Sequence, residues 1–347
     1  MPSIAIVGAS GYGGTELLRL LHRHPNLDVH VVAAAASAGA PVRAVAPNIP
    51  DRAGGGELLE AVDVDDLARA DVVVLGTPDE VSLELAPALI AAGTRVVDLS
   101  GAFRLDAATF RTWYGHEHTA PAHAMDGTDP AVYGLTEHAR ERIVTARLVA
   151  NPGCYPTATL MGLIPLRELL DPAGIVVNAM SGTSGAGRSS RDTLQASVVH
   201  GDVVAYGAPS HRHTVEIEAH GAPGGMSAPI VFTPHLVPMS RGILATISAS
   251  LRPGVGQAEV DARLADAYAS EPFVHVLPVG EFPRTKAVHG ANSCLLSAIV
   301  DERTGRVLVT SVIDNLVKGA AGQALQNVNV MLGLDETAGL DVIGVYP

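Results

Sequence analysis

Short apolar runs and stretches of helical periodicity alternate over the first hundred residues. The apolar runs have the length and β-branched composition of buried strands: "SIAIV", "LDVHVVAAAA", "ADVVVL" and "TRVVDL". Between these runs, apolar residues recur at helical spacing in "TELLRLL" and "EVSLELAPALI". Strands that alternate with helices form a parallel, doubly wound sheet, whose ligands bind at the carboxyl ends of the strands. We therefore predict a Rossmann-type α/β domain.

The pattern changes after residue 150, where longer β-rich segments such as "APIVFTPHLVP" and "GILATISASL" predict a mixed or antiparallel sheet with a few helices. The segment "DNLVKGAAGQALQNVNVMLGL" predicts one long helix that returns to the first domain. A chain of 347 residues exceeds the usual size of a single core. We therefore predict a dinucleotide-binding domain at residues 1–150, completed by residues 313–347. Residues 151–312 form a second, α+β catalytic domain.

Composition and charge exclude several classes of protein. The formal net charge is −13, and the lysines, Lys286 and Lys318, form no basic patch of the kind that nucleic acids require. No apolar stretch approaches the ~20 residues that span a bilayer, and the first residues lack the basic region of a signal peptide. The two cysteines, Cys154 and Cys294, are far apart, so we expect reduced thiols. We predict a cytoplasmic protein without nucleic-acid or membrane partners.

A glycine cluster follows the first predicted strand. Gly8, Gly11 and Gly14 recur at intervals of three and differ from the usual G-x-G-x-x-G spacing. Glycines at this point let backbone N–H groups at a helix N-terminus approach a pyrophosphate. An ordinary tight turn between strand and helix is the alternative. We predict a dinucleotide site that comprises Gly8, Ser10, Gly11, Tyr12, Gly13 and Gly14.

The segment after the second strand bears on the choice of coenzyme. An NAD site normally offers an acidic residue to the ribose hydroxyls here. This segment, "VVAAAASAGAPVR", offers Ser37 and, further on, Arg43. The absence of an acidic residue favours NADP, and we predict that Ser37 contacts its 2′-phosphate.

Cys154 lies in "NPGCYPTATL", between a Pro-Gly pair and a predicted helix that has Pro156 in its first turn. A free cysteine is often simply a small core residue. A thiol at a helix N-terminus, however, has a lowered pKa and is nucleophilic, because unsatisfied N–H groups and the helix dipole stabilise the thiolate. The same N–H groups stabilise an oxyanion that forms when sulfur attacks a carbonyl carbon. We predict that Cys154 is the nucleophile.

A thiol beside a nicotinamide suggests a thioester that is reduced by hydride, and this chemistry requires a proton donor. His211 and His213 in "HRHTVEIE" are the candidates. We expect an extended segment there, with both rings on one face, so a metal pair competes with this hypothesis. No third ligand is suggested nearby, and we predict no metal. We interpret His116 and His118 in "YGHEH" as part of a solvated or substrate-contacting loop.

Taken together, these motifs resemble those of the N-acetyl-γ-glutamyl-phosphate reductases, NADPH-dependent enzymes of arginine biosynthesis related to the aspartate-semialdehyde dehydrogenases. The resemblance spans nearly the whole chain. It rests on "GASGYGGTEL", "VVDLSGAFRL", "WYGHEH", "YGLTE", "NPGCYPTATL", "SGTSGAGR", "HRHTVEIE", "FTPHLVPMSRGILATI" and "IDNLVKGAAGQALQN".

The resemblance implies the reaction and the roles of individual residues. Cys154 would attack the acyl phosphate and release phosphate, and NADPH would reduce the thioester to N-acetylglutamate 5-semialdehyde. His211 would act as the acid/base residue, with His213 as second choice. Arg104 would bind the acyl phosphate, since a guanidinium holds phosphate oxygens bidentately, although a surface salt bridge is the alternative. The remaining positions would line the substrate site (His213, Ser184) and the cofactor site (Ser181, Gly182, Asn315).

For the last group of residues, plain structural roles stay open: an interdomain loop for Ser181 and Gly182, and a helix N-cap for Asn315. The resemblance also implies a glyceraldehyde-3-phosphate dehydrogenase-like second domain and a homo-oligomer, a tetramer or a dimer. Two departures from the family stand out. Gly13 replaces a threonine or similar residue, and the region near Ser37 is alanine-rich. Alternative functions are reduction of aspartyl or carrier-linked aminoadipyl phosphate, or a noncatalytic NADP-binding regulator.

Overall fold

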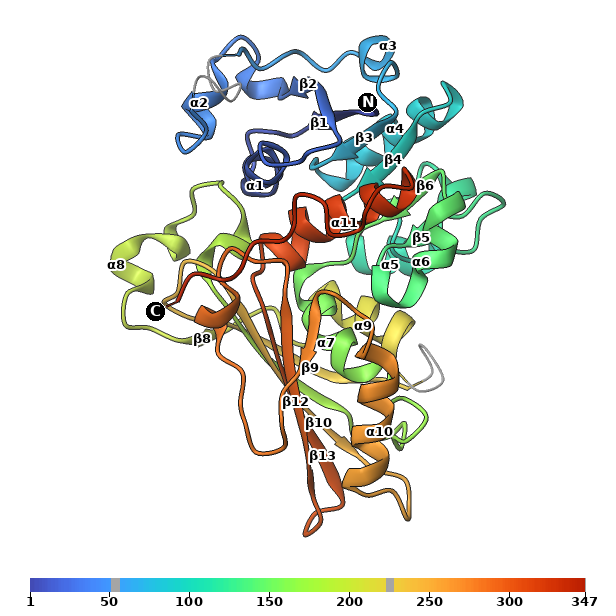
Figure 1. Cartoon of the computed structure of the whole chain (residues 1–347), viewed down its shortest axis with the longest axis vertical. Helices are drawn as coiled ribbons and strands as arrows, with labels where there is room; N and C mark the ends of the chain where they lie inside the picture. The colour runs from blue at the N-terminus through green and yellow to red at the C-terminus, as the bar shows by residue number, and fades with distance from the viewer. Residues whose placement is uncertain (51–56, 223–227, 347) are drawn as a thin grey trace. The chain divides into compact units, whose positions relative to one another are not determined.

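The computed structural model describes residues 1–50, 57–222 and 228–346, and Figure 1 traces their helices and strands. The chain divides into two compact units. The first unit comprises Met1–Gly153 and Ala320–Asp341, and the second comprises Cys154–Gly319 and Val342–Pro347. Each unit is built on a sheet of its own.

The sheet of the first unit has six parallel strands in the order β2-β1-β3-β4-β6-β5. The strands are β1 (Ser3–Val7), β2 (Asp28–Ala33), β3 (Val72–Leu75), β4 (Arg95–Asp98), β5 (Val132–Tyr133) and β6 (Leu148–Ala150). Central strands such as β3, with the sequence VVVL, are buried along their whole length. Continuous apolar strands of this kind are typical of parallel sheets covered on both faces. The predicted Rossmann-type sheet is confirmed.

Helices connect and cover these strands. They are α1 (Tyr12–Leu21), α2 (Val42–Val45), α3 (Val64–Leu67), α4 (Asp79–Ala91), α5 (Ala107–Tyr114), α6 (Thr136–Thr145) and α11 (Gly322–Met331). In α1, Leu17, Leu18 and Leu21 are buried, as the helical periodicity predicted. α11 is buried along its whole length and packs on α6, β4 and α1.

The sheet of the second unit has seven strands in the order β11-β12-β13-β10-β7-β9-β8. The strands are β7 (Val176–Ser181), β8 (Val204–Ala205), β9 (Val231–Leu236), β10 (Ile243–Ser250), β11 (Val274–Val276), β12 (Cys294–Asp301) and β13 (Arg306–Ile313). The pairs β7/β9 and β11/β12 are parallel and the others are antiparallel. The predicted mixed sheet is confirmed.

One face of this second sheet is covered by helices. The helices of the unit are α7 (Cys154–Leu163), α8 (Ala196–Val199), α9 (His213–Gly221) and α10 (Gln257–Tyr268). The apolar helix α7 packs on β10, β13 and α9, and α10 packs on β11 and β12 (Figure 1). In β10, buried residues alternate strictly with half-buried ones. The other face therefore carries partly exposed apolar side chains, including Met180, Val231 and Leu308.

The end of the chain differs from our expectation in two respects. We expect residues 313–347 to complete the first domain, whereas Ile313 is the last residue of β13 and the chain returns to the first unit only at Ala320. It leaves that unit again after Asp341. The expected single helix consists of a π-helical turn, Val317–Ala321, followed by α11. The boundary differs because residues up to Ile313 pair with β10 and β12, which fixes them in the second sheet.

Candidate active site

The glycine cluster forms the tight turn between β1 and α1. Gly8 has a φ of +84°, and a Cβ on it would lie 2.2 Å from the carbonyl oxygen of Gly76. A Cβ on Gly14 would lie 2.5 Å from the carbonyl oxygen of Gly8. Real Cβ atoms do not approach other atoms so closely. Both glycines are therefore required by the turn itself.

This turn suits the pyrophosphate of a dinucleotide. α1 begins at Tyr12, and its N-cap is Gly11, which has no side chain to accept hydrogen bonds from the N–H groups of the first turn. Helix N-termini of this kind bind anions through their N–H groups and dipole. Ser10, Tyr12 and Gly13 are half-buried at the same turn. These residues fit a dinucleotide, and their individual contacts stay predictions.

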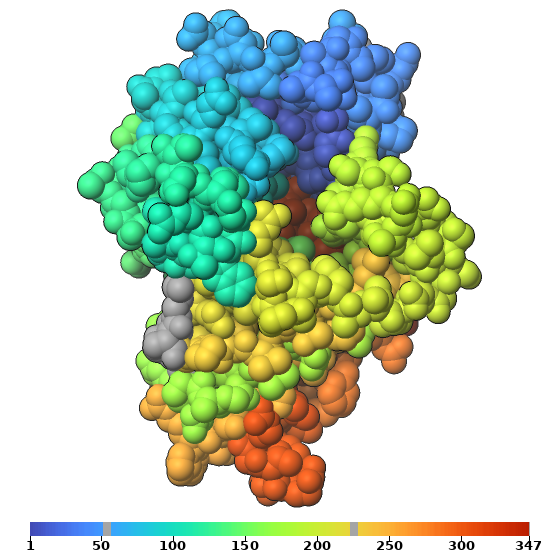
Figure 2. Space-filling model, turned by 180° about the vertical axis from the view of Figure 1, so that it is seen from behind, coloured from blue at the N-terminus to red at the C-terminus, as the bar shows by residue number. Residues whose placement is uncertain are grey.

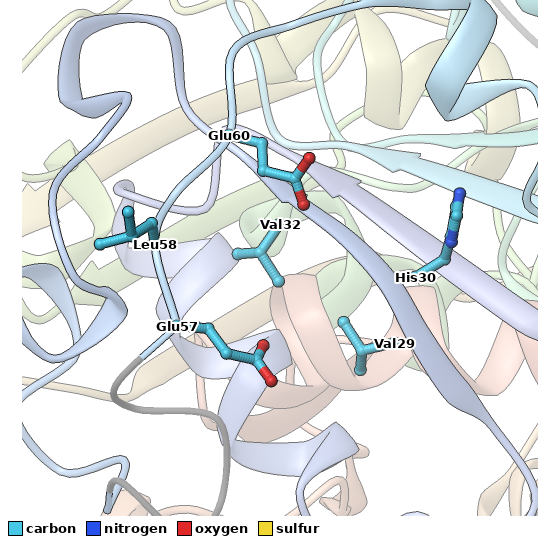
Figure 3. Close-up of a pocket in the computed structure, with 6 residues that line it drawn as sticks. All are labelled: Val29, His30, Val32, Glu57, Leu58 and Glu60. Atoms are coloured by element: carbon cyan, nitrogen blue, oxygen red, sulfur yellow. The ribbon is translucent and has the colours of Figure 1, made fainter.

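The segment after β2 contains the residues proposed for the coenzyme ribose. Ser37 is half-buried and ends a 3-10 turn, and Arg43 is exposed in α2. A cavity of about 430 Å³ lies beside β2 and is lined by Val29, His30, Val32, Glu57, Leu58 and Glu60 (Figure 3). Backbone hydrogen bonds join Glu60 to Val32 and Ala34. None of the predicted site residues lines this cavity.

Cys154 is the first residue of α7, as predicted, and its side chain is half-buried. The residues that follow it in α7, from Tyr155 to Leu163, are all buried. The thiol therefore lies at the N-terminal end of α7, which is the only part of this helix that is not fully buried. At a helix N-terminus, N–H groups and the dipole favour the thiolate.

Aromatic side chains surround the start of α7. The Tyr155 hydroxyl lies 3.0 Å from the Tyr206 hydroxyl and donates to the carbonyl oxygen of His235 at 3.3 Å. Burial raises the pKa of Tyr155, so this phenol stays protonated. Tyr206 follows the exposed segment around α8, which stands out from the surface as a lobe in Figure 2.

His211 lies among these rings. Its ring centroid is 4.9 Å from that of His213, 5.8 Å from that of Tyr155 and 5.6 Å from that of Tyr206. Its Nδ1 accepts a hydrogen bond from the backbone N–H of His213 at 3.2 Å, which assigns the proton of the neutral ring to Nε2. Burial, assisted by the charge of Arg212, lowers the pKa of His211 to about 4. At neutral pH His211 is therefore an uncharged N–H donor.

The predicted extended conformation of the two histidines was wrong. His213 is the first residue of α9, and Arg212 before it is already helical. The rings still lie together because the N–H of His213 reaches back to His211. Helix periodicity also brings in Glu216, a fully buried residue whose Oε2 is 4.0 Å from His213 Nε2. We missed Glu216 because we expected alternation, whereas i, i+3 spacing would have indicated this pair.

A cluster of potential metal ligands lies elsewhere. Among the described residues, three such side chains with mutually close donor atoms occur at Asp79, Glu80 and His116. His116 Nε2 is 2.9 Å from Asp79 Oδ2, and this contact raises the pKa of His116. His118 is buried against Phe103 and makes no contact of this kind in the cluster. The geometry is that of an ion pair at the start of α4.

Arg104 is buried in the first unit. Its Nε donates to the carbonyl oxygen of Asn151 at 2.8 Å, and its Nη2 donates to that of Leu99 at 2.7 Å. These bonds join the loop after β4 to the segment that precedes Cys154. The open alternative of a surface salt bridge does not describe so buried a side chain. The predicted contact with the acyl phosphate stays a prediction.

Asn315 links two loops of the second unit. Its Oδ1 accepts a hydrogen bond from the N–H of Gly242 at 2.7 Å, and its Nδ2 donates to Ser184 Oγ at 3.0 Å. A Cβ on Gly182 would lie 2.8 Å from the backbone nitrogen of Arg241, so the two loops pack without space between them. The cofactor contacts of Ser181, Gly182 and Asn315, and the substrate contact of Ser184, stay predictions.

Asp314, not Asn315, caps the following turn. Its Oδ1 accepts hydrogen bonds from the N–H groups of Leu316 at 2.8 Å and Val317 at 3.2 Å. The alternative of a structural N-cap therefore applies to the preceding residue. Sequence reasoning missed Asp314, although aspartate is among the residues preferred at a helix start.

Comparison with known proteins agrees with this architecture. Two family models match the chain: the semialdehyde dehydrogenase NAD-binding domain over residues 3–146 and the semialdehyde dehydrogenase dimerisation domain over residues 154–315. Aspartate semialdehyde dehydrogenase II from Vibrio cholerae, solved in complex with ASA, has a TM-score of 0.72 at 18% identity, with 96% of this chain and 98% of that chain covered. Aspartate semialdehyde dehydrogenase with NADP from Candida albicans has a TM-score of 0.70 at 17% identity, with 96% of this chain and 98% of that chain covered. The fold and site define an oxidoreductase of the semialdehyde dehydrogenase class.

Full-length relatives narrow this class. The N-acetyl-gamma-glutamyl-phosphate reductase of Cellvibrio japonicus is 45% identical and is covered, like this chain, over 100% of its length. That of Geobacillus kaustophilus is 45% identical over 99% of this chain and 100% of its own. The chain belongs to the N-acetyl-γ-glutamyl-phosphate reductase family, which confirms the predicted resemblance. No helix in the described part of the chain has the length and apolar character needed to cross a membrane.

Proposed function

We propose that the protein reduces N-acetyl-γ-glutamyl phosphate to N-acetylglutamate 5-semialdehyde and phosphate with NADPH, a step of arginine biosynthesis. The observation that carries this proposal is the half-buried Cys154 at the N-terminus of α7. The names of the relatives that are 45% identical over the whole chain support the choice of substrate.

In the first step the sulfur of Cys154 attacks the acyl carbon. A carbon–sulfur bond forms, the bond from carbon to the phosphate oxygen breaks, and the thiol proton leaves with the phosphate. The N-terminus of α7 lowers the energy of the developing thiolate. Arg104 neutralises the phosphate of the substrate, and Ser184 and His213 contact the rest of the acyl group.

In the second step the thioester on Cys154 is reduced. When bound, NADPH supplies a hydride to the carbonyl carbon. Nε2–H of the neutral His211 donates a hydrogen bond to the oxygen on which negative charge develops. The carbon–sulfur bond then breaks, the aldehyde leaves, and Cys154 takes up a proton. This role differs from the acid/base role that the sequence led us to expect, because with a pKa of about 4 His211 is neutral and carries a second proton only in acid. A hydrogen-bond donor suffices, since the oxyanion collapses directly to the aldehyde.

The proposed coenzyme contacts come from turns and loops of the chain. Gly8, Gly11 and Gly14 shape the turn that holds the pyrophosphate, with Ser10, Tyr12 and Gly13 beside them. Ser37 and Arg43 contact the 2′-phosphate, which favours NADP over NAD. Ser181, Gly182 and Asn315 contact the nicotinamide end.

The protein is a cytoplasmic homo-oligomer, a dimer or a tetramer. The open face of the second sheet supports self-association, because Met180, Val231 and Leu308 are 41%, 60% and 37% exposed on one face. The match to a dimerisation domain over residues 154–315 also supports self-association. Neither Cys154 nor Cys294 is in a disulfide in the described part of the chain, which suits the proposed cytoplasmic location.

The reverse reaction tests the proposal. N-acetylglutamate semialdehyde, NADP and phosphate should produce absorbance of the reduced coenzyme, and omission of phosphate should remove it. Cys154→Ser should abolish turnover and retain coenzyme binding, with Cys294→Ser as the matched control. A serine variant that keeps most of its rate contradicts the covalent mechanism. Faster turnover with aspartate semialdehyde contradicts the proposed substrate.

A further inference from the structure

A π-helical turn, Val317–Ala321, joins β13 to α11. The N–H of Gly319 donates to the carbonyl oxygen of Asp314 at 3.0 Å, five residues earlier in the chain. This hydrogen-bond pattern is rare and occurs mostly as single turns, frequently at functional sites.

Asp314 fixes the turn at its start. The side chain is fully buried, and its Oδ1 holds the N–H groups of Leu316 and Val317. Its Oδ2 accepts a hydrogen bond from the N–H of Gly290 at 2.7 Å and lies 3.6 Å from Arg241 Nη1. Gly319 is therefore fixed by its hydrogen bond to the backbone of Asp314, whose side chain makes hydrogen bonds of its own.

Gly319 lies directly against the nucleophile. A Cβ on Gly319 would be 2.8 Å from Cys154 Cβ and 3.2 Å from Cys154 Cα. A third contact would be Ile313 Cδ1, at 3.2 Å. The φ of Gly319 is not positive, so its backbone conformation is open to any L-residue. The close approach to Cys154 therefore explains the glycine.

We propose that Gly319 is a positioning residue for the catalytic thiol. Because Gly319 has no side chain, the backbone of the π turn packs directly against Cys154 and fixes its position at the start of α7. The proposal rests on the role of Cys154 in the proposed function. A side chain at position 319 displaces the Cβ of Cys154, because an approach of 2.8 Å is shorter than real Cβ contacts allow. The thiol then leaves the position that the acyl carbon and the N–H groups of α7 require.

Gly319→Ala tests this proposal, with Gly162→Ala as the matched control. A Cβ on Gly162 also meets neighbours too closely, Ile247 Cδ1 and Val309 Cγ1 both at 2.9 Å, and Gly162 lies in α7 itself. The control thus strains the same helix without contacting Cys154. The measurements are kcat, KM and the pH profile of Cys154 alkylation by iodoacetamide, with the modified residue identified by mass spectrometry.

We expect Gly319→Ala to lower kcat about 10- to 100-fold, as displacements of ångström size do, with KM changed less than about twofold. The rate of Cys154 alkylation should change over the whole pH profile. Gly162→Ala should have a kcat, a KM and a Cys154 alkylation rate close to those of the wild type. Equal behaviour of the two alanine variants overturns the proposal. Activity retained by Cys154→Ser would contradict the proposed function instead, so the two failures are distinguishable.

A second pair of variants, Cys154→Gly alone and combined with Gly319→Ala, tests the contact in case Gly319→Ala alone does not fold. Cys154→Gly removes the Cβ that would lie 2.8 Å from the methyl group of Gly319→Ala, and leaves the contacts of 3.2 Å with the Cα of residue 154 and with Ile313 Cδ1. The double variant should therefore lose much less in unfolding temperature, relative to Cys154→Gly, than Gly319→Ala loses relative to the wild type. Recovery of folding in the double variant supports the contact even when Gly319→Ala alone does not fold. If the added methyl group is as disruptive in the Cys154→Gly background as in the wild type, the contact with the nucleophile is not what requires a glycine, and the proposal fails.

Discussion

The lowered pKa of His211 predicts a specific loss of stability in mild acid. The pKa is 6.5 in an exposed ring and about 4 in the folded protein, where burial is the main cause of the shift. Between these values the unfolded chain binds a proton at His211 and the folded chain does not. The free energy of unfolding therefore falls as pH decreases from 6.5 to 4, and is independent of this group above 6.5.

The magnitude follows from the two pKa values. The difference of 2.5, at 1.36 kcal/mol for each pKa unit, gives a loss of about 3 kcal/mol below pH 4. At pH 5 the loss is about 2 kcal/mol, which corresponds to about 4 to 8 °C in the unfolding temperature of a unit of this size. His211→Asn removes the titration and retains, through Oδ1, an acceptor for the N–H of His213.

Thermal unfolding of the wild type and His211→Asn at pH 7 and pH 5 measures this effect. Other groups titrate in both proteins, so the quantity to compare is the difference between their pH-induced shifts. We expect the wild type to lose about 4 to 8 °C more than the variant. Equal losses would show that the His211 ring titrates near its ordinary pKa, and the argument for a neutral donor would then be refuted.

Three further predictions concern the coenzyme site and the core of the first unit. Gly14→Ala should lower NADP affinity at least about 10-fold and destabilise the fold by about 1 to 3 kcal/mol, because its Cβ would lie 2.5 Å from a carbonyl oxygen. Titration with NADP measures this loss, and wild-type affinity in Gly14→Ala would contradict the assignment of the turn to the coenzyme. Arg43→Ala should lower kcat/KM for NADPH about 10-fold and leave that for NADH unchanged, and an equal decrease for both coenzymes would contradict the assignment. Asn327→Leu should lower the free energy of unfolding by about 3 kcal/mol, since this fully buried amide bonds Gly134, Thr136 and Asn151; denaturation that matches the wild type would contradict this.

Much of the fold was predictable because local patterns and tertiary structure agree. Strand β3 is continuously apolar and is buried in the parallel sheet, and α7 starts at Cys154, after the Pro-Gly pair. These features depend on neighbours in the sequence, which periodicity and glycine or proline positions report directly.

The features that we missed depend on residues far apart in the chain. The spacing of His211 and His213 suits a strand, whereas packing against α7 in the second core favours the helix that begins at His213. Asn315 donates a hydrogen bond to Ser184, which lies 131 residues earlier in the sequence, and nothing local to "IDNLV" indicates this partner. The contact between Gly319 and Cys154 likewise appears only in three dimensions.

The position of α11 determines the order in which a growing chain is completed. The second unit is nearly continuous, whereas the first needs Ala320–Asp341, which the ribosome adds only after Cys154–Gly319 has been made. Until then the surfaces of α6, β4 and α1 that α11 covers remain exposed. The first unit therefore cannot complete its fold until α11 has been synthesised. Residues 1–153, if released from the ribosome without α11, should stay susceptible to proteases.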